Sequence, residues 1–252
     1  MMEERSMKLL YFSKAKLLLL WVSVGMLLLL FTVDYNKVSE NVCAFSSPVS
    51  QKVIVIDPGH GGFDSGAVSP SGTREDELNL KVAKKLKQYL TNHNANVILT
   101  RTTNEALASR KSEDMRKRVE IIRANNPDLV ISIHMNKFSQ TQYFGGQTFY
   151  LSGSEKGKKL AECIQTQILE NLIEGNTRQI KGVDNLLILK ASKAPTVLVE
   201  CGFLSNLKEE DLLKTEEYQD KIAWSIFNGI LSFLTNENEP RWEDGLPSAF
   251  LN

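Results

Sequence analysis

The chain has 252 residues, of which 42% are hydrophobic and 24% charged, a composition typical of one globular domain with a sizeable core. Its 30 basic and 30 acidic residues balance, so the overall charge argues against a nucleic-acid partner. The three cysteines, Cys43, Cys163 and Cys201, are too few and too scattered for a disulfide framework, which leaves packing to hold the core together.

An uncharged apolar run from Leu17 to Val33 is long enough to span a bilayer. Basic residues precede it and place the following chain outside the cytoplasm; they are Arg5, Lys8, Lys14 and Lys16. Val42 and Ala44 offer a small-x-small cleavage site far from the apolar run, so a retained anchor is favoured over a cleaved signal peptide. We therefore expect residues 1–33 to form a membrane anchor or signal segment, residues 34–51 to form a linker, and the protein to be exported.

Strand and helix patterns alternate from residue 52 onward. Short apolar runs predict strands at 52–57, 96–100, 129–133, 185–190 and 196–200, and a run of mixed polarity predicts an edge strand at 147–151. Apolar residues at helical spacing predict helices at 77–92, 109–125, 154–173 and 215–233. This alternation predicts an α/β fold in which a mostly parallel twisted sheet is covered by helices on both faces, as a single domain over residues 52–235. Residues 236–252 are expected to be a disordered tail.

Three ionisable side chains stand at the carboxyl ends of predicted strands, where parallel sheets bind their ligands. His60 follows the first strand, His134 follows the third, and Glu200 ends the strand at 196–200. Two imidazoles and a carboxylate from the acidic segment at residues 75–77, with a fourth position left for water, form an open zinc site, and imidazole ligands favour zinc over calcium or magnesium. The sequence therefore predicts a metallohydrolase. The remaining histidine, His93, stands among asparagines at a helix end and is expected to be solvated.

The glycine-rich turn around His60 has a second interpretation as a phosphate loop. Asp64 stands where such a loop requires its third glycine, so nucleotide binding is not expected. Spacing alone does not identify the carboxylate ligand, because Glu75 and Glu77 both belong to the acidic start of one helix.

The strand-end residues also have structural interpretations. His134 alone would fit a core histidine equally well. Asp57 is a rival carboxylate at the end of a strand, although the Pro58 that follows favours a turn-forming role. Glu200 ends an apolar strand, where a carboxylate is costly unless it has a partner or a chemical task.

These residues lie in motifs that resemble the zinc-dependent N-acetylmuramoyl-L-alanine amidases of the Amidase_3 family. The resemblance covers nearly all of residues 52–234 and is carried by Asp57-Pro-Gly-His-Gly-Gly62, Glu75-Asp-Glu-Leu-Asn-Leu80, Thr100-Arg101, Ser132-Ile-His-Met-Asn136 and Val199-Glu-Cys-Gly-Phe-Leu-Ser-Asn206. Carried over position by position, it implies that His60, Glu75 and His134 bind one zinc ion per chain and that Glu200 is the catalytic glutamate. The resemblance thus selects Glu75 over Glu77.

The resemblance also implies the substrate, which is the amide bond between the lactyl group of N-acetylmuramic acid and L-alanine in peptidoglycan. Within the family, residues 109–116, residues 146–150 and the single short anchor look like the sporulation-specific, CwlD-type amidases. Those relatives act on spore-cortex peptidoglycan, in the first step toward muramic δ-lactam. We therefore expect an enzyme anchored in the membrane or secreted toward the cell wall or spore cortex.

Regulation and substrate contacts are less constrained by the sequence. Some relatives carry a helical insertion that blocks the zinc site, but the connection from Tyr150 to Ser154 is too short for one. Control by a separate activator protein is left open. Arg101 and Asn136 are candidates for substrate binding, with structural roles as the alternative. The rival functions are a non-catalytic wall-binding domain and a zinc peptidase that cuts stem peptides.

Overall fold

Six strands form one sheet in the order β2-β1-β3-β6-β4-β5 in the computed structural model, which describes residues 21–26 and 47–238. β1, β2, β3 and β6 are parallel, whereas β4 runs antiparallel to β6 and parallel to β5. The strands are β1 (Val53–Pro58), β2 (Asn96–Leu99), β3 (Leu129–Asn136), β4 (Gln147–Leu151), β5 (Lys181–Val183) and β6 (Thr196–Phe203).

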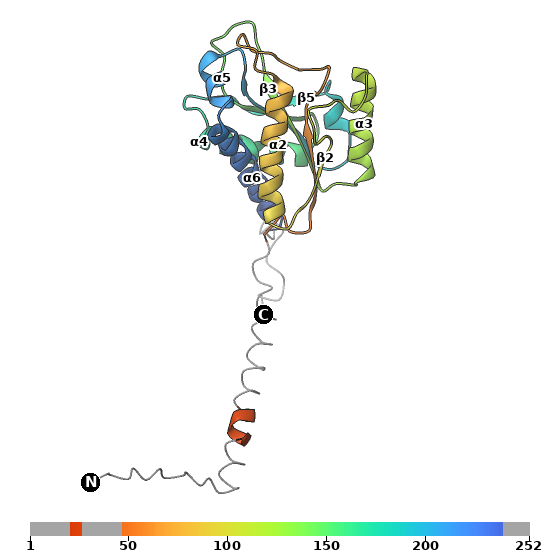
Figure 1. Cartoon of the computed structure of the whole chain (residues 1–252), viewed down its shortest axis with the longest axis vertical. Coiled ribbons are helices and arrows are strands. Elements are labelled where there is room, and N and C mark those ends of the chain that lie inside the picture. The colour runs from red at the N-terminus through yellow and green to blue at the C-terminus, as the bar shows by residue number, and fades with distance from the viewer. Residues whose placement is uncertain (1–20, 27–46, 239–252) are drawn as a thin grey trace, which may run out of the picture. The chain divides into compact units, whose positions relative to one another are not determined.

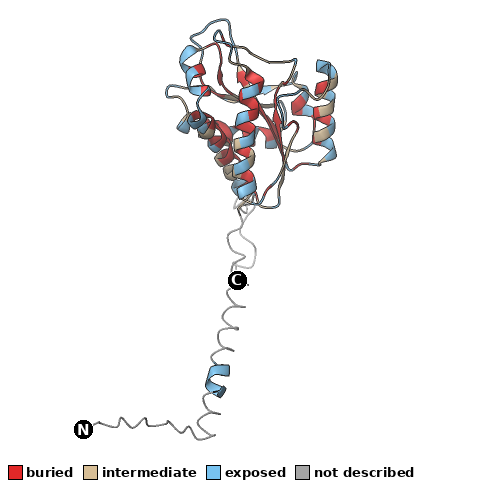
Figure 2. Ribbon diagram, viewed as in Figure 1, coloured by how far each residue is buried: buried red, intermediate tan, exposed pale blue. Residues whose placement is uncertain are grey.

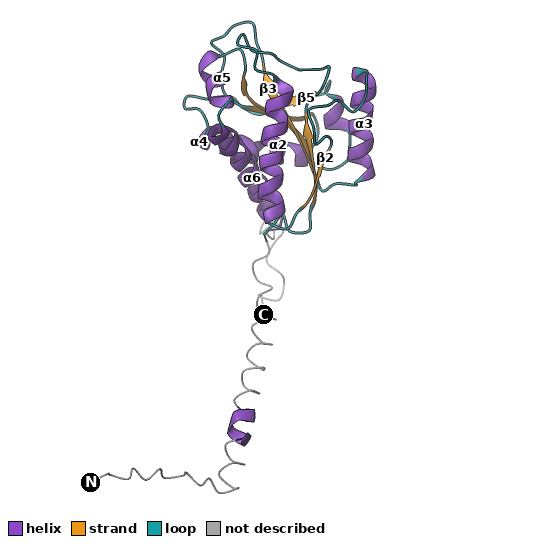
Figure 3. Cartoon of the chain, in the orientation of Figure 1, coloured by secondary structure: helices purple, strands orange, loops and turns teal. Residues whose placement is uncertain are grey.

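Helices cover the sheet on both faces (Figures 1 and 3). On one face, the larger core cluster joins the strands to α2 (Glu75–Asn92), α4 (Glu155–Asn171) and α6 (Glu216–Asn238). On the other face, a smaller cluster joins them to α3 (Lys111–Ala124) and the 3-10 helix η2 (Leu187–Lys190). The central strands are therefore apolar on both sides, as Figure 2 shows by their burial. The predicted fold class is confirmed.

The amino-terminal segment is described only in part. Residues 21–26 are helical and exposed, and residues 47–238 belong to a separate compact unit. Within these two described ranges, no helix combines the length and the apolar character needed to cross a bilayer. Most of the predicted anchor at 17–33, most of the linker at 34–51, and Cys43 lie outside the described residues. Cys163 and Cys201 are free thiols.

Several elements differ from the sequence-based prediction. β4 is not an edge strand, because the three-residue β5 pairs with its outer side. The predicted strand at 185–190 is wrong: Leu187–Lys190 form the 3-10 helix η2, which buries Ile188 and Leu189 against the sheet. A further short helix, α5 (Leu207–Leu213), follows β6 and has Asn206 as its N-cap.

Some element ends also lie elsewhere than expected. β3 and β6 continue past their predicted ends, so His134 and Glu200 lie within strands. The last helix, α6, runs to Asn238, three residues into the expected tail. An ion pair between Lys156 and Glu237 at 3.2 Å links that last turn to α4. The remainder of the tail, from residue 239, lies outside the described residues.

Candidate metal centre

His60 lies two residues beyond β1 in a turn of uncommon backbone geometry. Its φ is +59°, in the left-handed region that non-glycine residues rarely adopt, and Gly61 and Gly62 follow with φ of +140° and +58°. A left-handed non-glycine residue costs about 1–3 kcal/mol and persists only where the surroundings hold it. The turn must therefore be supported by its neighbours.

Two buried guanidinium groups provide that support. Arg101 donates to the carbonyl oxygens of Pro58 and Gly59, both at 2.9 Å. Arg118 of α3 donates to the carbonyl oxygen of Pro58 at 2.7 Å and to that of His60 at 2.6 Å. Three consecutive carbonyl groups are thus held, which fixes the point at which His60 leaves the sheet.

Asp57 completes this support from within β1. Its carboxylate accepts hydrogen bonds from Arg118 at 2.8 Å, from Thr100 at 2.6 Å and from Ser132 at 2.9 Å. Burial alone would raise the pKa of Asp57, but Arg118 and the Thr100 hydroxyl outweigh burial and lower it. The turn-forming role expected for Asp57 is wrong, because its side chain instead neutralises a buried arginine.

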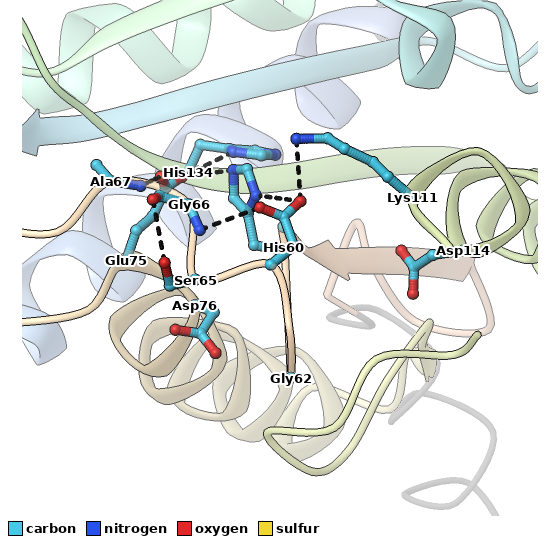
Figure 4. A network of polar contacts seen from close by, with 12 residues as sticks. His60, Gly62, Ser65, Gly66, Ala67, Glu75, Asp76, Lys111, Asp114 and His134 are labelled. Carbon is cyan, nitrogen blue, oxygen red and sulfur yellow. Dashed lines mark hydrogen bonds and ion pairs between the residues drawn. The ribbon is translucent and has the colours of Figure 1, made fainter. Parts of the chain in front are cut away.

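Glu75 is the first residue of α2 and not part of the loop before it. One carboxylate oxygen, Oε2, accepts from the backbone N–H of Ala67 at 2.6 Å. The other, Oε1, accepts from Met135 N–H at 3.1 Å and lies 2.9 Å from His134 Nδ1 and 3.3 Å from His60 Nε2. Burial raises the pKa of Glu75, but the contacts to His134 and His60 outweigh burial and place it well below its usual range. Figure 4 shows this network.

His134 and Glu200 are paired residues on the neighbouring parallel strands β3 and β6. Both side chains project toward the α3 side of the sheet, because they share the alternation of Val130 and Leu198 in the smaller core cluster. Among the described residues, none hydrogen-bonds to Glu200 Oε2, although this oxygen is buried. Burial raises the pKa of Glu200 to about 7.

Two glycines leave the space that these side chains occupy. A Cβ atom added at Gly59 would lie 2.2 Å from the His134 ring. One added at Gly66 would lie 2.3 Å from Glu75 Oε2 and 2.7 Å from the His60 ring. The backbone therefore approaches the ligand-type side chains so closely that only glycine fits.

The resulting donor set suits a metal ion. His60, Glu75 and His134 each offer one ligand atom, and these atoms lie within 4.8 Å of one another. Two imidazoles and one carboxylate match the donor types of an open zinc site. Glu200 adds a second carboxylate, and its oxygen without a partner is the kind of group that serves a bound water. The residues present therefore fit zinc.

The other candidates occupy different environments. Arg101 is only 3% exposed, and its four hydrogen bonds all go to backbone carbonyl groups, in keeping with the structural alternative. Asn136 ends β3, two residues beyond His134, and remains partly exposed. His93 contacts none of the proposed ligands. Its ring lies 4.7 Å from that of Phe227 and its Nδ1 lies 2.8 Å from the carbonyl oxygen of Tyr89, so it is only partly solvated.

Arg118 is the main residue that sequence reasoning missed. It lies in the polar stretch 109–125, where an arginine is expected to face solvent, yet it is 1% exposed. Asp114, four residues earlier, accepts from its Nε at 2.6 Å. The i,i+4 spacing of the two residues was a visible signal, but the same spacing is common on exposed helices.

Comparisons with known proteins agree on one family. The family model described as N-acetylmuramoyl-L-alanine amidase matches residues 54–232. The germination-specific N-acetylmuramoyl-L-alanine amidase of Bacillus subtilis (strain 168) is 37% identical over 231 residues, which are 87% of this chain and 97% of that protein.

Solved structures give the same answer. The CwlD amidase from Clostridioides difficile, in complex with the GerS lipoprotein, matches with a TM-score of 0.72 and 39% identity, over 74% of this chain and 100% of that one. An N-acetylmuramoyl-L-alanine amidase from Clostridium difficile 630 matches with a TM-score of 0.68 and 30% identity, over 75% of this chain and 100% of that one. The chain therefore belongs to the N-acetylmuramoyl-L-alanine amidase family, as its sequence motifs predicted.

Proposed function

We propose that this amidase is zinc-dependent and hydrolyses the bond between the lactyl group of N-acetylmuramic acid and L-alanine in peptidoglycan. His60, Glu75 and His134 would hold one zinc ion per chain, and Glu200 would move the proton. The observation that carries this proposal is the buried Glu200 oxygen on the strand beside His134, which no group of the described residues hydrogen-bonds.

The chemistry divides between the metal and the protein. When bound, zinc supplies a Lewis acid that polarises a carbonyl group and lowers the pKa of water. Glu200 takes a proton from the attacking water and returns it to the departing amine of L-alanine. A pKa near 7 suits both halves of that task, because the carboxylate can gain and lose a proton at neutral pH.

Each remaining residue has a positioning task in this proposal. The turn held by Arg101 and Arg118 sets the direction of His60. The backbone N–H groups of Ala67 and Met135 hold the Glu75 carboxylate in position. Asn136 remains a candidate for contact with the substrate, since it is partly exposed beyond His134, whereas Arg101 is fully engaged with the backbone.

The biological setting that we propose follows the relatives. The similar Bacillus subtilis enzyme is named as germination-specific, and the similar CwlD enzyme was solved with a lipoprotein. We place the present chain in the remodelling of spore-cortex peptidoglycan that leads to muramic δ-lactam. It would act outside the cytoplasmic membrane, tethered or exported through residues 1–33, with a separate protein as activator.

The test is mass spectrometry of the products formed from purified peptidoglycan by the full-length, zinc-loaded protein in mild detergent. Free stem peptides that begin with L-alanine are expected. Glu200→Gln should bind zinc as the wild type does, yet release these peptides at least about 100-fold more slowly, because general acid-base catalysis is lost.

Other products would contradict the proposal. Peptides cut within the stem, with L-alanine still attached to the glycan, would identify a peptidase. No release by a folded, zinc-bound protein, even with extract of sporulating cells added, would favour a non-catalytic wall-binding domain.

A further inference from the structure

We propose that Asp64 is a positioning residue that orients the His60 ring and commits its Nε2 atom to the metal. The inference deepens the proposed function and rests on it for the identity of the metal. Asp64 stands four residues after His60, in the same glycine-rich turn.

The His60 ring lies between two carboxylates. On one side, Nε2 is 3.3 Å from Glu75 Oε1, which belongs to the proposed ligand set. On the other side, Nδ1 is 2.9 Å from Asp64 Oδ2, outside that set. At the present ring angle, Nδ1–H is close to Oδ2 but not in line with it. The Cβ–Cγ torsion of histidine is broad, so the ring can change its angle at little energetic cost.

The two contacts engage different nitrogen atoms of the ring. A neutral imidazole carries one N–H and one lone pair, and a metal takes the lone pair. An acceptor at Nδ1 stabilises the proton there, so the lone pair falls on Nε2, which faces Glu75. Without Asp64, the proton is free to occupy Nε2 and to hydrogen-bond Glu75, which blocks the metal. Loss of such an outer carboxylate typically weakens metal binding about 10–100-fold.

Asp64 is itself held in place. Its Oδ1 accepts from Gly66 N–H at 3.3 Å. Its backbone exchanges hydrogen bonds with Gly61, from Gly61 N to Asp64 O at 2.8 Å and from Asp64 N to Gly61 O at 3.1 Å. The carboxylate therefore needs little ordering when it accepts from His60.

A lysine competes for the same oxygen. Lys111, the first residue of α3, places Nζ 3.1 Å from Asp64 Oδ2, and its side chain is 71% exposed. Removal of Lys111 should leave Oδ2 more available to His60. The two residues thus predict effects of opposite sign, which a general loss of structure would not produce.

The test measures the zinc dissociation constant of the full-length protein by competition with a chromogenic chelator. Asp64→Ala should raise the constant about 10–100-fold, and Asp64→Asn, which keeps an acceptor oxygen, should raise it less. Lys111→Ala should lower it. Glu113→Gln removes a negative charge from an exposed position on α3 and should have no effect. The visible spectrum of the cobalt-substituted protein should change for Asp64→Ala alone.

The outcomes separate this inference from the proposed function. If Asp64→Ala binds zinc as tightly as the wild type, with an unchanged cobalt spectrum, Asp64 does not position His60. If the wild type itself binds no zinc, the metal assignment fails instead. If Asp64→Ala lowers the melting temperature of the metal-free protein, its weaker zinc binding could come from lost structure. Asp64→Asn then decides the question: a zinc affinity of Asp64→Asn equal to that of the Glu113→Gln control would overturn the inference.

Discussion

At the scale of single residues, the candidate metal centre depends on positions that have no side chain. His134 lies against the Cα atom of Gly59, and Glu75 and His60 both lie against Gly66. A methyl group at either position has to displace a proposed ligand. This dependence can be tested without changing any group that binds metal.

We predict that Gly59→Ala lowers amidase activity about 100-fold, because the new methyl group displaces the His134 ring and a shift of about 1 Å has that cost. Product release from peptidoglycan measures the effect. Gly72→Ala is the control, since a Cβ there meets nothing within 4 Å. Its φ of +91° strains alanine, whereas Gly59 has no positive φ, so backbone strain alone would harm the control more than Gly59→Ala. Equal activities of the two variants would contradict the tight packing described for Gly59.

The same scale shows what sequence reasoning can and cannot find. His60, His134 and Glu200 were identified as candidates because each follows or ends a clear strand, and the ends of parallel strands share one edge. The choice of Glu75 over Glu77 needed the family resemblance, since both stand in one acidic turn. The buried pairing of Asp57 with Arg118 was missed, because it joins residues far apart in the chain and leaves no local pattern.

At the scale of elements, a buried carboxylate of α5 hydrogen-bonds this helix to the end of β6. Glu209, in its first turn, accepts from Phe203 N–H at 2.8 Å and from Gly145 N–H at 3.0 Å. Burial outweighs these hydrogen bonds and raises the pKa of Glu209 from 4.5 to about 7. The folded protein therefore binds more protons than the unfolded chain between these two values, and its stability falls as the pH rises through them.

We predict that Glu209→Gln removes this part of the pH dependence. The free energy of unfolding of the wild type, relative to the variant, should decline by up to about 3 kcal/mol between pH 4.5 and 7. Urea unfolding at intervals of pH measures it. The neighbouring Glu210→Gln is the control. Burial raises the pKa of Glu210, but hydrogen bonds from the hydroxyl groups of Ser71, Ser69 and Thr73 outweigh burial and lower this pKa below its usual value. The contribution of Glu210 to the free energy of unfolding therefore changes only below pH 4.5. Parallel curves for the wild type and Glu209→Gln would refute the prediction.

Prediction of the elements failed where apolar runs were short. The run at 185–190 has too few residues to separate a strand from a buried helical turn by periodicity. The order of the last strands depends on tertiary pairing, because the three residues of β5 carry almost no strand signal and yet cover β4. The strands β1, β3 and β6 were located from their apolar runs, which are buried on both faces, although β3 and β6 continue past their predicted ends.

At the scale of the whole molecule, the proposed ligands come from three separate parts of the chain. His60 stands in the turn after β1, Glu75 begins α2, and His134 lies in β3. Unfolding separates them, so zinc should bind the folded protein far more tightly than the unfolded chain. Binding of this kind stabilises a protein in proportion to the logarithm of the ligand concentration.

We predict that zinc at 100 times its dissociation constant adds about 2.7 kcal/mol to the free energy of unfolding. For a domain of this size, that corresponds to a rise in melting temperature of roughly 5–10 °C over chelator-treated protein. Thermal unfolding followed by near-ultraviolet circular dichroism measures the shift. His134→Ala should unfold at one temperature with and without zinc, and a wild type that behaves in the same way would rule out a metal coupled to the fold.

The pairing of His134 with Glu200 across β3 and β6 has a consequence for how this enzyme acquires its activity. Successive side chains of a strand point to opposite faces, so a slip of one residue between the two strands would turn Glu200 toward α4 and α6. Such a misfolded molecule would keep most of its secondary structure and still be inert. The activity per folded molecule therefore reports the register between β3 and β6. Refolded preparations of this protein can be compared by that activity.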